Sequence, residues 1–255
     1  MRLAITCMGC FQADGKPSDE AVLVEMRDDG LYSVTCRRGH TTVTAIQEQK
    51  FEILFDLGAM ALLDGYPREA VSSIASALER FYEYYIQVLC LKHGVSYEAF
   101  SDAWKPLSRQ SERQLGAFLF LYLLEKKKPL HPSIVDARPT TGSGGKGQLT
   151  WTKFRNDVTH KGYIPSTEEV FLYGDLVYQF IYRLIKELRS SAAEYMQKAT
   201  SHHLKRAHDA AAGKQISTMT IPTLVSLVRV DQPAATFAEA LKGLENYKRW
   251  MYHRA

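Results

Sequence analysis

The spacing of apolar residues changes once along this chain of 255 residues. In the first 46 residues they come in short runs, AVLVEM and LYSVTC, rich in β-branched or aromatic side chains and each preceded by a polar turn. Such runs predict strands, so we expect a small β-hairpin module over residues 1–46. From residue 47 onward apolar residues recur every three or four positions, which predicts helices.

The helical part is punctuated by glycine, proline and one capping sequence. An apolar helix is expected over 51–63 and is stopped by Gly65 and Pro67, and Pro67 then starts a long amphipathic helix that ends before Gly94. Ser166 and Glu169 form a capping box that opens another helix. Further helices are expected over 97–104, 114–128, 150–161, 193–212 and 236–253, whereas residues 218–230 fit either a strand or a short helix. The pattern predicts a mainly α protein with units at 1–46, 47–190 and 191–255, the last a mostly helical extension.

Composition supports a folded chain without a membrane span. Hydrophobic residues make up 45% of the sequence, enough for a sizeable core and too many for wholesale disorder. No run approaches the roughly 20 apolar residues that cross a bilayer. The first ten residues, MRLAITCMGC, contain an apolar run too short for a secretory signal, so we expect a cytoplasmic protein.

Positive charge is concentrated in the last third of the chain. The net charge is +4, but residues 183–255 alone carry +6, so the remainder carries −2. A basic region suits a polyanionic partner such as RNA. The same charges also fit ordinary solvated helix faces, and charge alone does not separate the two interpretations.

Three of the four cysteines lie in the predicted β module. Cys7 and Cys10 form a CxxC pair, and Cys36 is followed by His40 after three residues. Two chelating pairs with sulfur and nitrogen donors suit tetrahedral zinc, and a filled Cys₃His set would be structural because it leaves no open position. The segment resembles zinc ribbons. Its alternative is three buried cysteines and a surface histidine. Cys90 falls on the apolar face of a helix and is expected in the core.

The segment FRNDVTHKGYIP, residues 154–165, carries the strongest functional signal. On a helix Asn156 and His160 lie one turn apart on the same face, and the long side chain of Arg155 reaches the same region. The opposite face is apolar and is expected in the core; it consists of Trp151, Phe154 and Val158. Gly162 ends this helix, which places the histidine in its last turn.

These residue types suit metal-independent RNA cleavage. An imidazole accepts the proton of a ribose 2′-OH or donates one to the leaving 5′-oxygen. A guanidinium binds phosphate and offsets charge in the transition state, while an asparagine orients the histidine. The spacing alone equally fits a histidine that interacts with the helix dipole and a surface arginine.

The same residues resemble a known family. RNDVTHKGYIP, followed by a capped helix and preceded by the helix GYPREAVSSIASALERFYE, is similar to the R-x₄₋₆-H motif region of HEPN-domain proteins. The resemblance covers roughly residues 48–189. It implies an all-α bundle that often forms homodimers with two facing motifs, and many members are ribonucleases of toxin, antiviral or RNA-processing systems. The motif positions are Arg155, Asn156 and His160, with Glu79 as a weaker supporting candidate or an exposed helix-face residue.

The hypothesis is therefore an endoribonuclease that cleaves tRNA or mRNA to 2′,3′-cyclic phosphate and 5′-OH ends. It would act as a homodimer, with a structural zinc and a regulatory protein partner, as a toxin or antiviral effector. The rivals are a non-catalytic module that binds RNA or nucleotides and a protein-docking scaffold. TTGSGGKGQL lacks the Walker A pattern and is expected to be a flexible loop near the motif helix, in a position to act as a lid over the substrate. His202, His203 and His208 are expected on a polar basic helix and not around a metal.

Overall fold

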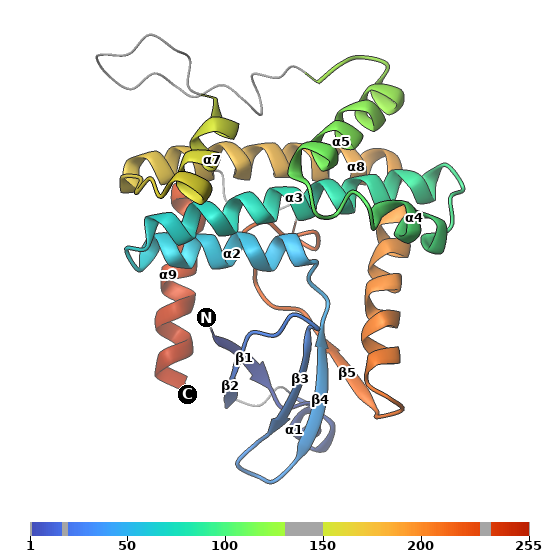
Figure 1. Ribbon diagram of the computed structural model, residues 1–255. Helices are drawn as coiled ribbons and strands as arrows, with labels where there is room; N and C mark the ends of the chain where they lie inside the picture. Colours follow the sequence, from blue (N-terminus) through green and yellow to red (C-terminus); the bar gives the residue numbers. More distant parts are fainter. Residues whose placement is uncertain (1, 17–19, 131–149, 230–235, 255) are drawn as a thin grey trace.

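The computed structural model describes residues 2–16, 20–130, 150–229 and 236–254. This part of the chain is mainly helical and carries a small sheet region built mostly from its N-terminal residues. Figure 1 shows most of the helices in a layer above the strands, while the orange and red helical segments near the C-terminus extend down on either side of them. The fold class predicted from the sequence is confirmed at this level. The TTGSGGKGQL loop lies outside the described residues. Among the helices in the described ranges, none has the length and hydropathy of a membrane span.

Helices α2 (Lys50–Leu63) and α3 (Pro67–Lys92) form an antiparallel hairpin at the centre of the helical layer. The chain reverses at Gly65, whose φ of 78° is a left-handed conformation that suits glycine. The two helices approach closely at Gly58, where an added Cβ would lie 2.6 Å from Cγ1 of Ile74. Aromatic rings fill the core between these helices and their neighbours; they include Phe51, Phe55, Phe81, Tyr85, Phe118 and Tyr178.

Three shorter helices pack around α3. Helix α4 (Tyr97–Trp104) follows its C-terminal end, and α5 (Ser111–Lys126) and α7 (Trp151–Lys161) lie above it in Figure 1. Helix α5 is attached by a narrow stripe of buried side chains, namely Gln114, Phe118 and Tyr122. The predicted boundaries of these helices agree with the observed ones to within a few residues.

Helix α8 (Thr167–Ala210) begins at the predicted capping box, in which Ser166 Oγ accepts from the N–H of Glu169 and the glutamate accepts from the N–H of Ser166. It bends at Ala192, whose φ of −149° is not helical. The first arm runs along α3, and the second turns down toward the strands (Figure 1). The bend lies next to the expected boundary at residue 190, and the second arm corresponds to the separate helix expected over 193–212.

Two small sheets replace the single hairpin expected near the N-terminus. Strand β1 (Arg2–Thr6) pairs antiparallel with β2 (Ala21–Glu25), and α1 (Met8–Asp14) lies between them in the chain. Strand β3 (Leu31–Thr35) pairs antiparallel with β4 (Thr41–Ile46). The runs at residues 21–26 and 31–36, which contain β2 and β3, do not form the expected hairpin with each other, because β2 pairs with β1 and β3 with β4, two strands that the apolar pattern did not predict.

The region beyond residue 190 is built into the rest of the fold. Strand β5 (Ile216–Met219) pairs parallel with β4, and α9 (Phe237–Arg254) contacts α2 and α8. Between them, residues 220–229 have neither regular helix nor strand, which resolves the ambiguity over 218–230: a short strand comes first and an irregular segment follows. We call residues 220–229 the strap.

The strap is fixed by three buried carboxyl groups. Glu48, just before α2, and Glu52 and Asp56 on α2 are spaced four residues apart, and each is at most 4% exposed. They accept hydrogen bonds from backbone N–H groups of the strap, each at 2.9 Å; the donors are Ile221, Leu227 and Leu224 respectively. Tyr182 adds a hydrogen bond from its hydroxyl to the Leu224 carbonyl at 2.8 Å. Side chains therefore supply the hydrogen-bond partners that the backbone of the strap does not find in a helix or sheet.

Candidate functional site

The four predicted metal ligands lie together. The Sγ atoms of Cys7, Cys10 and Cys36 and a ring nitrogen of His40 all fall within 4.8 Å of one another. Cys10 Sγ is 3.7 Å from Cys36 Sγ and 3.3 Å from His40 Nδ1. Two thiolates bound tetrahedrally at a zinc–sulfur distance of about 2.3 Å would be roughly 3.8 Å apart, so the donor set fits a four-coordinate metal ion.

Local backbone structure explains why these donors meet. Cys7 is the N-cap of α1 and Cys10 lies one turn later. Cys36 and His40 are joined by a tight turn, in which the Cys36 N–H donates to the His40 carbonyl at 3.1 Å and the Gly39 φ is 82°. At Gly9 an added Cβ would be 2.8 Å from the Cβ of His40, so only glycine lets the histidine approach α1 this closely. His40 thus lies beside the three cysteines and not apart from them on the surface, as the alternative interpretation had it.

Helix α7 carries the second predicted site. Thr150 caps its start by accepting from the Lys153 N–H at 3.2 Å, and Gly162 ends it with a φ of 71°. The apolar stripe is buried as expected and consists of Trp151, Phe154 and Val158. Asn156 and His160 are therefore held at the opposite face, whereas Arg155 lies next to the buried stripe, one turn after Trp151. Asp157, which lies between Asn156 and His160, is occupied by ion pairs with Lys153 and Lys161.

Arg155 is fixed by two contacts from neighbouring helices. Its Nη1 lies 3.5 Å from Oε1 of Glu79 on α3, and its Nη2 donates to Oγ of Ser111 on α5 at 3.1 Å. The arginine side chain is 18% exposed and the glutamate 26%, so the pair is largely shielded from water. Burial raises the pKa of Glu79, while the charges of Arg155 and Arg80 oppose this rise. Glu79 is thus a partner of the motif arginine and not an exposed helix-face residue.

Asn156 and His160 are placed differently from Arg155. Asn156 is half-buried and His160 is exposed in the last turn of α7. Glu112, at the start of α5, lies near Arg155 and His160: hydrogen bonds from its own backbone N–H and from Ser111 lower its pKa, and Arg155 and His160 add to the effect. Within one chain, therefore, the arginine lies in a protected position and the histidine at an open rim.

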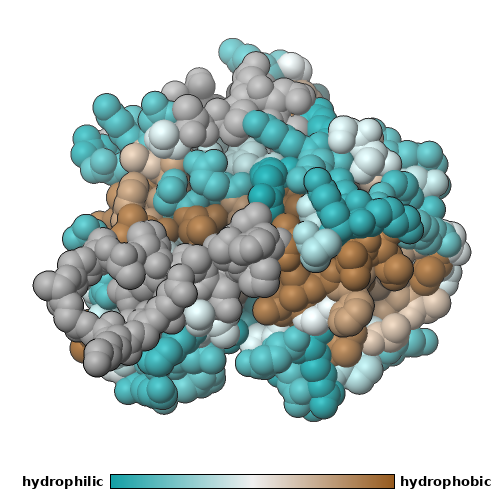
Figure 2. All heavy atoms as spheres, turned by 90° about the horizontal axis from the view of Figure 1, so that it is seen from above, coloured by the Kyte–Doolittle hydropathy of each residue, from teal (hydrophilic) through white to brown (hydrophobic). Residues whose placement is uncertain are grey.

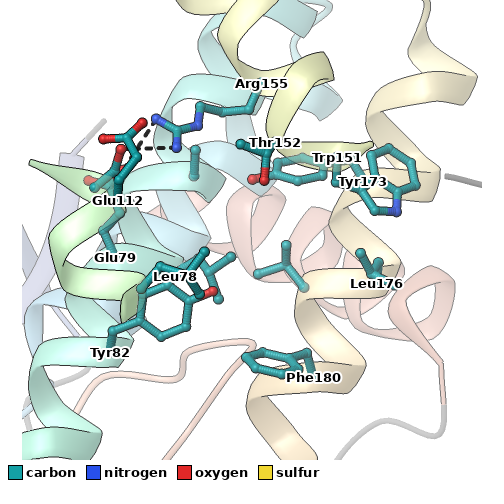
Figure 3. A pocket seen from close by; sticks show the side chains of 14 residues that line it. Leu78, Glu79, Tyr82, Glu112, Trp151, Thr152, Arg155, Tyr173, Leu176 and Phe180 are labelled. Carbon is teal, nitrogen blue, oxygen red and sulfur yellow. Dashed lines mark hydrogen bonds and ion pairs between the residues drawn. The ribbon is translucent and has the colours of Figure 1, made fainter. Parts of the chain in front are cut away.

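A pocket lies directly beneath Arg155, between α3, α5, α7 and α8 (Figure 3). It encloses about 60 Å³. Its mouth carries polar side chains, including Glu79, Ser111, Glu112 and Arg155, and its interior is apolar and aromatic. Neither Asn156 nor His160 lines it. Ser111 and Glu112 could not be predicted as pocket residues, because their only local sequence signal is that of an ordinary helix start.

The other histidines considered in the sequence have structural contacts. His202 stacks on Tyr97 with ring centroids 4.6 Å apart and planes at 12°. Nε2 of His203 lies 3.1 Å from the carbonyl of Ile46, at the end of β4. These contacts attach the second arm of α8 to its neighbours, and no metal-ligand group in the described ranges includes these histidines.

No protein-family model, curated protein or solved structure gives a significant match to this chain.

Proposed function

We propose that this protein is a metal-independent endoribonuclease of the HEPN type. The observation that carries the proposal is the position of Arg155, which α7 presents beside Glu79 and Ser111 on the same short helix that exposes His160. A guanidinium that is already held in position loses little conformational freedom when it binds a phosphate, and it offsets the negative charge that develops in the transition state. An exposed imidazole with access to solvent can exchange protons with a substrate.

In the proposed reaction the ribose 2′-oxygen attacks the adjacent phosphorus and the 5′-oxygen leaves. His160 accepts the 2′-OH proton or donates the proton that the 5′-oxygen takes up, while Arg155 binds the non-bridging phosphate oxygens. Asn156, one turn before His160, orients the imidazole or the substrate. The products are a 2′,3′-cyclic phosphate and a 5′-OH.

Two proton-transfer groups are needed for this reaction, and a homodimer would supply them. Each chain contributes one motif histidine, and the open position of His160 leaves room for a second copy of α7 opposite it. The substrate would be tRNA or mRNA, and a regulatory protein would restrain the enzyme as in toxin or antiviral systems. These features rest on the resemblance of the motif region to HEPN-domain proteins.

The cysteine–histidine cluster is proposed to hold a structural zinc ion. Cys7, Cys10, Cys36 and His40 provide the sulfur and nitrogen donors that zinc prefers, and all four positions would be filled by protein. The metal would supply folding free energy to the strand region and not take part in cleavage.

One observation favours a second candidate, a non-catalytic module that binds RNA or nucleotides or docks a protein. Glu79 already compensates the charge of Arg155. His160 does not line the pocket that Arg155 lines. In that case Arg155 and His160 would only hold phosphate.

The test is incubation of the purified protein with tRNA and mRNA in EDTA, beside His160→Ala and Arg155→Ala, with mapping of product ends. Circular dichroism checks that the protein stays folded once EDTA is present. Cleavage by the wild type alone, with cyclic-phosphate ends, supports the nuclease. If all three proteins bind RNA and none cleaves it, the binding module is supported. If none binds RNA, the docking function remains.

A further inference from the structure

The pocket beneath Arg155 combines aromatic walls with a small interior. Its inner surface is formed by apolar or aromatic side chains, including Leu78, Tyr82, Trp151, Tyr173, Leu176 and Phe180. Figure 3 shows these side chains around a common space, with Arg155 and Glu112 at one end. The enclosed 60 Å³ corresponds to roughly two water molecules, so the interior admits only one edge of a planar ring.

A buried hydroxyl without a partner points into this space. Tyr82 is 3% exposed, and its hydroxyl makes no hydrogen bond to any of the described residues. Figure 3 shows the hydroxyl directed toward the middle of the pocket. The ring is held by stacking on Phe118 at 4.6 Å, so the hydroxyl keeps this direction. An unpaired buried hydroxyl is unfavourable, and a ligand that supplies a hydrogen bond would remove the penalty.

The mouth of the pocket favours a ligand that donates hydrogen bonds. The carboxyl groups of Glu79 and Glu112 and the guanidinium of Arg155 give it one negative charge when all are ionised. The Glu79 carboxylate and the Tyr82 oxygen are both acceptors, on the same helix, separated by three residues. The Arg155 guanidinium beside them is the group that would bind a phosphate.

We propose that this pocket binds the amino-bearing edge of one unstacked base of the RNA substrate, an inference that rests on the proposed function. The exocyclic amino group of adenine, cytosine or guanine donates to Glu79 and to the Tyr82 oxygen, and the phosphate of the same nucleotide lies against Arg155. Uracil presents carbonyl oxygens instead of an amino group and is repelled by the carboxylate. The pocket thereby selects which nucleotide lies next to the cleaved bond.

Mononucleotides test this directly, because their binding does not depend on cleavage. Trp151 lines the pocket, so a Trp104→Phe, Trp250→Phe protein reports binding through its remaining tryptophan. We expect saturable fluorescence changes with AMP, CMP and GMP, and at least tenfold weaker binding of UMP. Leu176→Phe, which fills the pocket, should abolish the change.

Tyr82→Phe removes only the hydroxyl. It should raise the thermal midpoint of the free protein, because an unpaired buried group is lost, and weaken AMP binding about tenfold. Tyr84→Phe is the matched control: its hydroxyl is also buried without a partner among the described residues, but it does not line the pocket. It should stabilise the protein and leave AMP binding unchanged.

The inference is overturned if Tyr82→Phe binds AMP as the wild type does, or if UMP binds equally well. If the protein binds mononucleotides selectively but does not cleave RNA, base binding in the pocket is supported and the proposed nuclease activity is rejected. If the protein cleaves RNA but neither binds mononucleotides nor shows a base preference, the nuclease activity is supported and base binding in the pocket is rejected.

Discussion

The backbone N–H of Leu224 donates a hydrogen bond of 2.9 Å to Oδ1 of Asp56, across 168 residues of sequence. Asp56 is 2% exposed, and Glu48 and Glu52 make equivalent bonds on either side. Each carboxyl group accepts a backbone hydrogen bond that a carbonyl group would accept if the strap were a strand or a helix. The relationship explains why an otherwise apolar helix carries acidic residues on its buried face.

These carboxyl groups make stability depend on pH. Burial raises the pKa of Glu48 to about 7 and the pKa values of Glu52 and Asp56 to about 8, from ordinary values of 4.5 and 3.8. Because the folded state then binds more protons than the unfolded state, their contribution is complete below about pH 4 and is lost as pH rises toward 8. We expect the free energy of unfolding, measured in urea, to carry a component that falls between pH 5 and 8.

Asp56→Asn isolates this component. The amide oxygen still accepts from Leu224 but does not titrate, so the pH profile should flatten. Asp56→Ala should instead cost about 1–3 kcal/mol at pH 6, because the Leu224 N–H is left buried without a partner. Asp102→Asn, at a side chain that is 74% exposed, is the control and should leave the profile unchanged. A wild-type profile unaffected by Asp56→Asn would contradict the assignment.

Metal content tests the cysteine–histidine cluster. The purified protein should contain one metal ion per chain by mass spectrometry, and Cys36→Ser should lose it. Cys90→Ser is the matched control. Cys90 packs against the helical core, so this variant should retain the metal. Equal metal content in the two variants would reject the site.

Gly9 tests the same cluster through packing. A methyl group there meets the Cβ of His40 at 2.8 Å, so Gly9→Ala should displace the imidazole and weaken metal binding at least tenfold in a chelator competition. Gly116→Ala, with nothing within 4 Å of the added Cβ, should leave metal affinity unchanged. Unaltered affinity in Gly9→Ala would show that His40 does not contribute.

Helix α9 is joined to α8 through another close approach. An added Cβ at Gly174 would lie 2.7 Å from Cε1 of Phe237, which is fully buried. Gly174→Ala should therefore destabilise the protein by about 1–3 kcal/mol in urea. Gly243→Ala, on the open face of α9, should stabilise it by roughly 0.5–1 kcal/mol. If the two changes have the same sign, α9 is not docked at this point.

Glu79→Gln separates two roles of the carboxylate beside Arg155. Removing its charge should steepen the salt dependence of RNA binding, because Arg155 is no longer compensated. Single-turnover cleavage should slow, because the guanidinium is less firmly positioned. Glu83→Gln is the control: Glu83 pairs with Arg80 at 2.8 Å on the same helix but does not line the pocket. Identical behaviour of both variants would remove Glu79 from the site.

Local sequence signals predicted most helices because their causes are local. Ser166 and Gly162 specify a helix start and a helix end within a few residues, and the stripe through Phe154 sets the buried face of α7. The grouping of Cys7, Cys10, Cys36 and His40 was also expected, since two chelating pairs are visible as spacings. Within each helix signal and each pair, the residues lie within one or two turns of each other.

Long-range partners were not predictable from these signals. Glu48, Glu52 and Asp56 stand four residues apart, which is a visible pattern, but nothing local indicates that residues 221–227 supply their donors. The same holds for β5, which pairs with a strand far earlier in the chain. Ser111 reaches Arg155 only because the start of α5 and helix α7 meet beside the middle of α3, near Glu79 and Arg80. Such relationships depend on the whole fold.

The attachment of the strap also has a consequence for biosynthesis. Glu48 leaves the ribosome long before its partner Ile221, which is 173 residues further along the chain. Until then the nascent N-terminal half exposes acidic side chains on an apolar helix and the open edge of β4. The final fold is therefore reached only after residues 216–227 have been translated, and chains that terminate before this point should be recognised by proteases as incomplete.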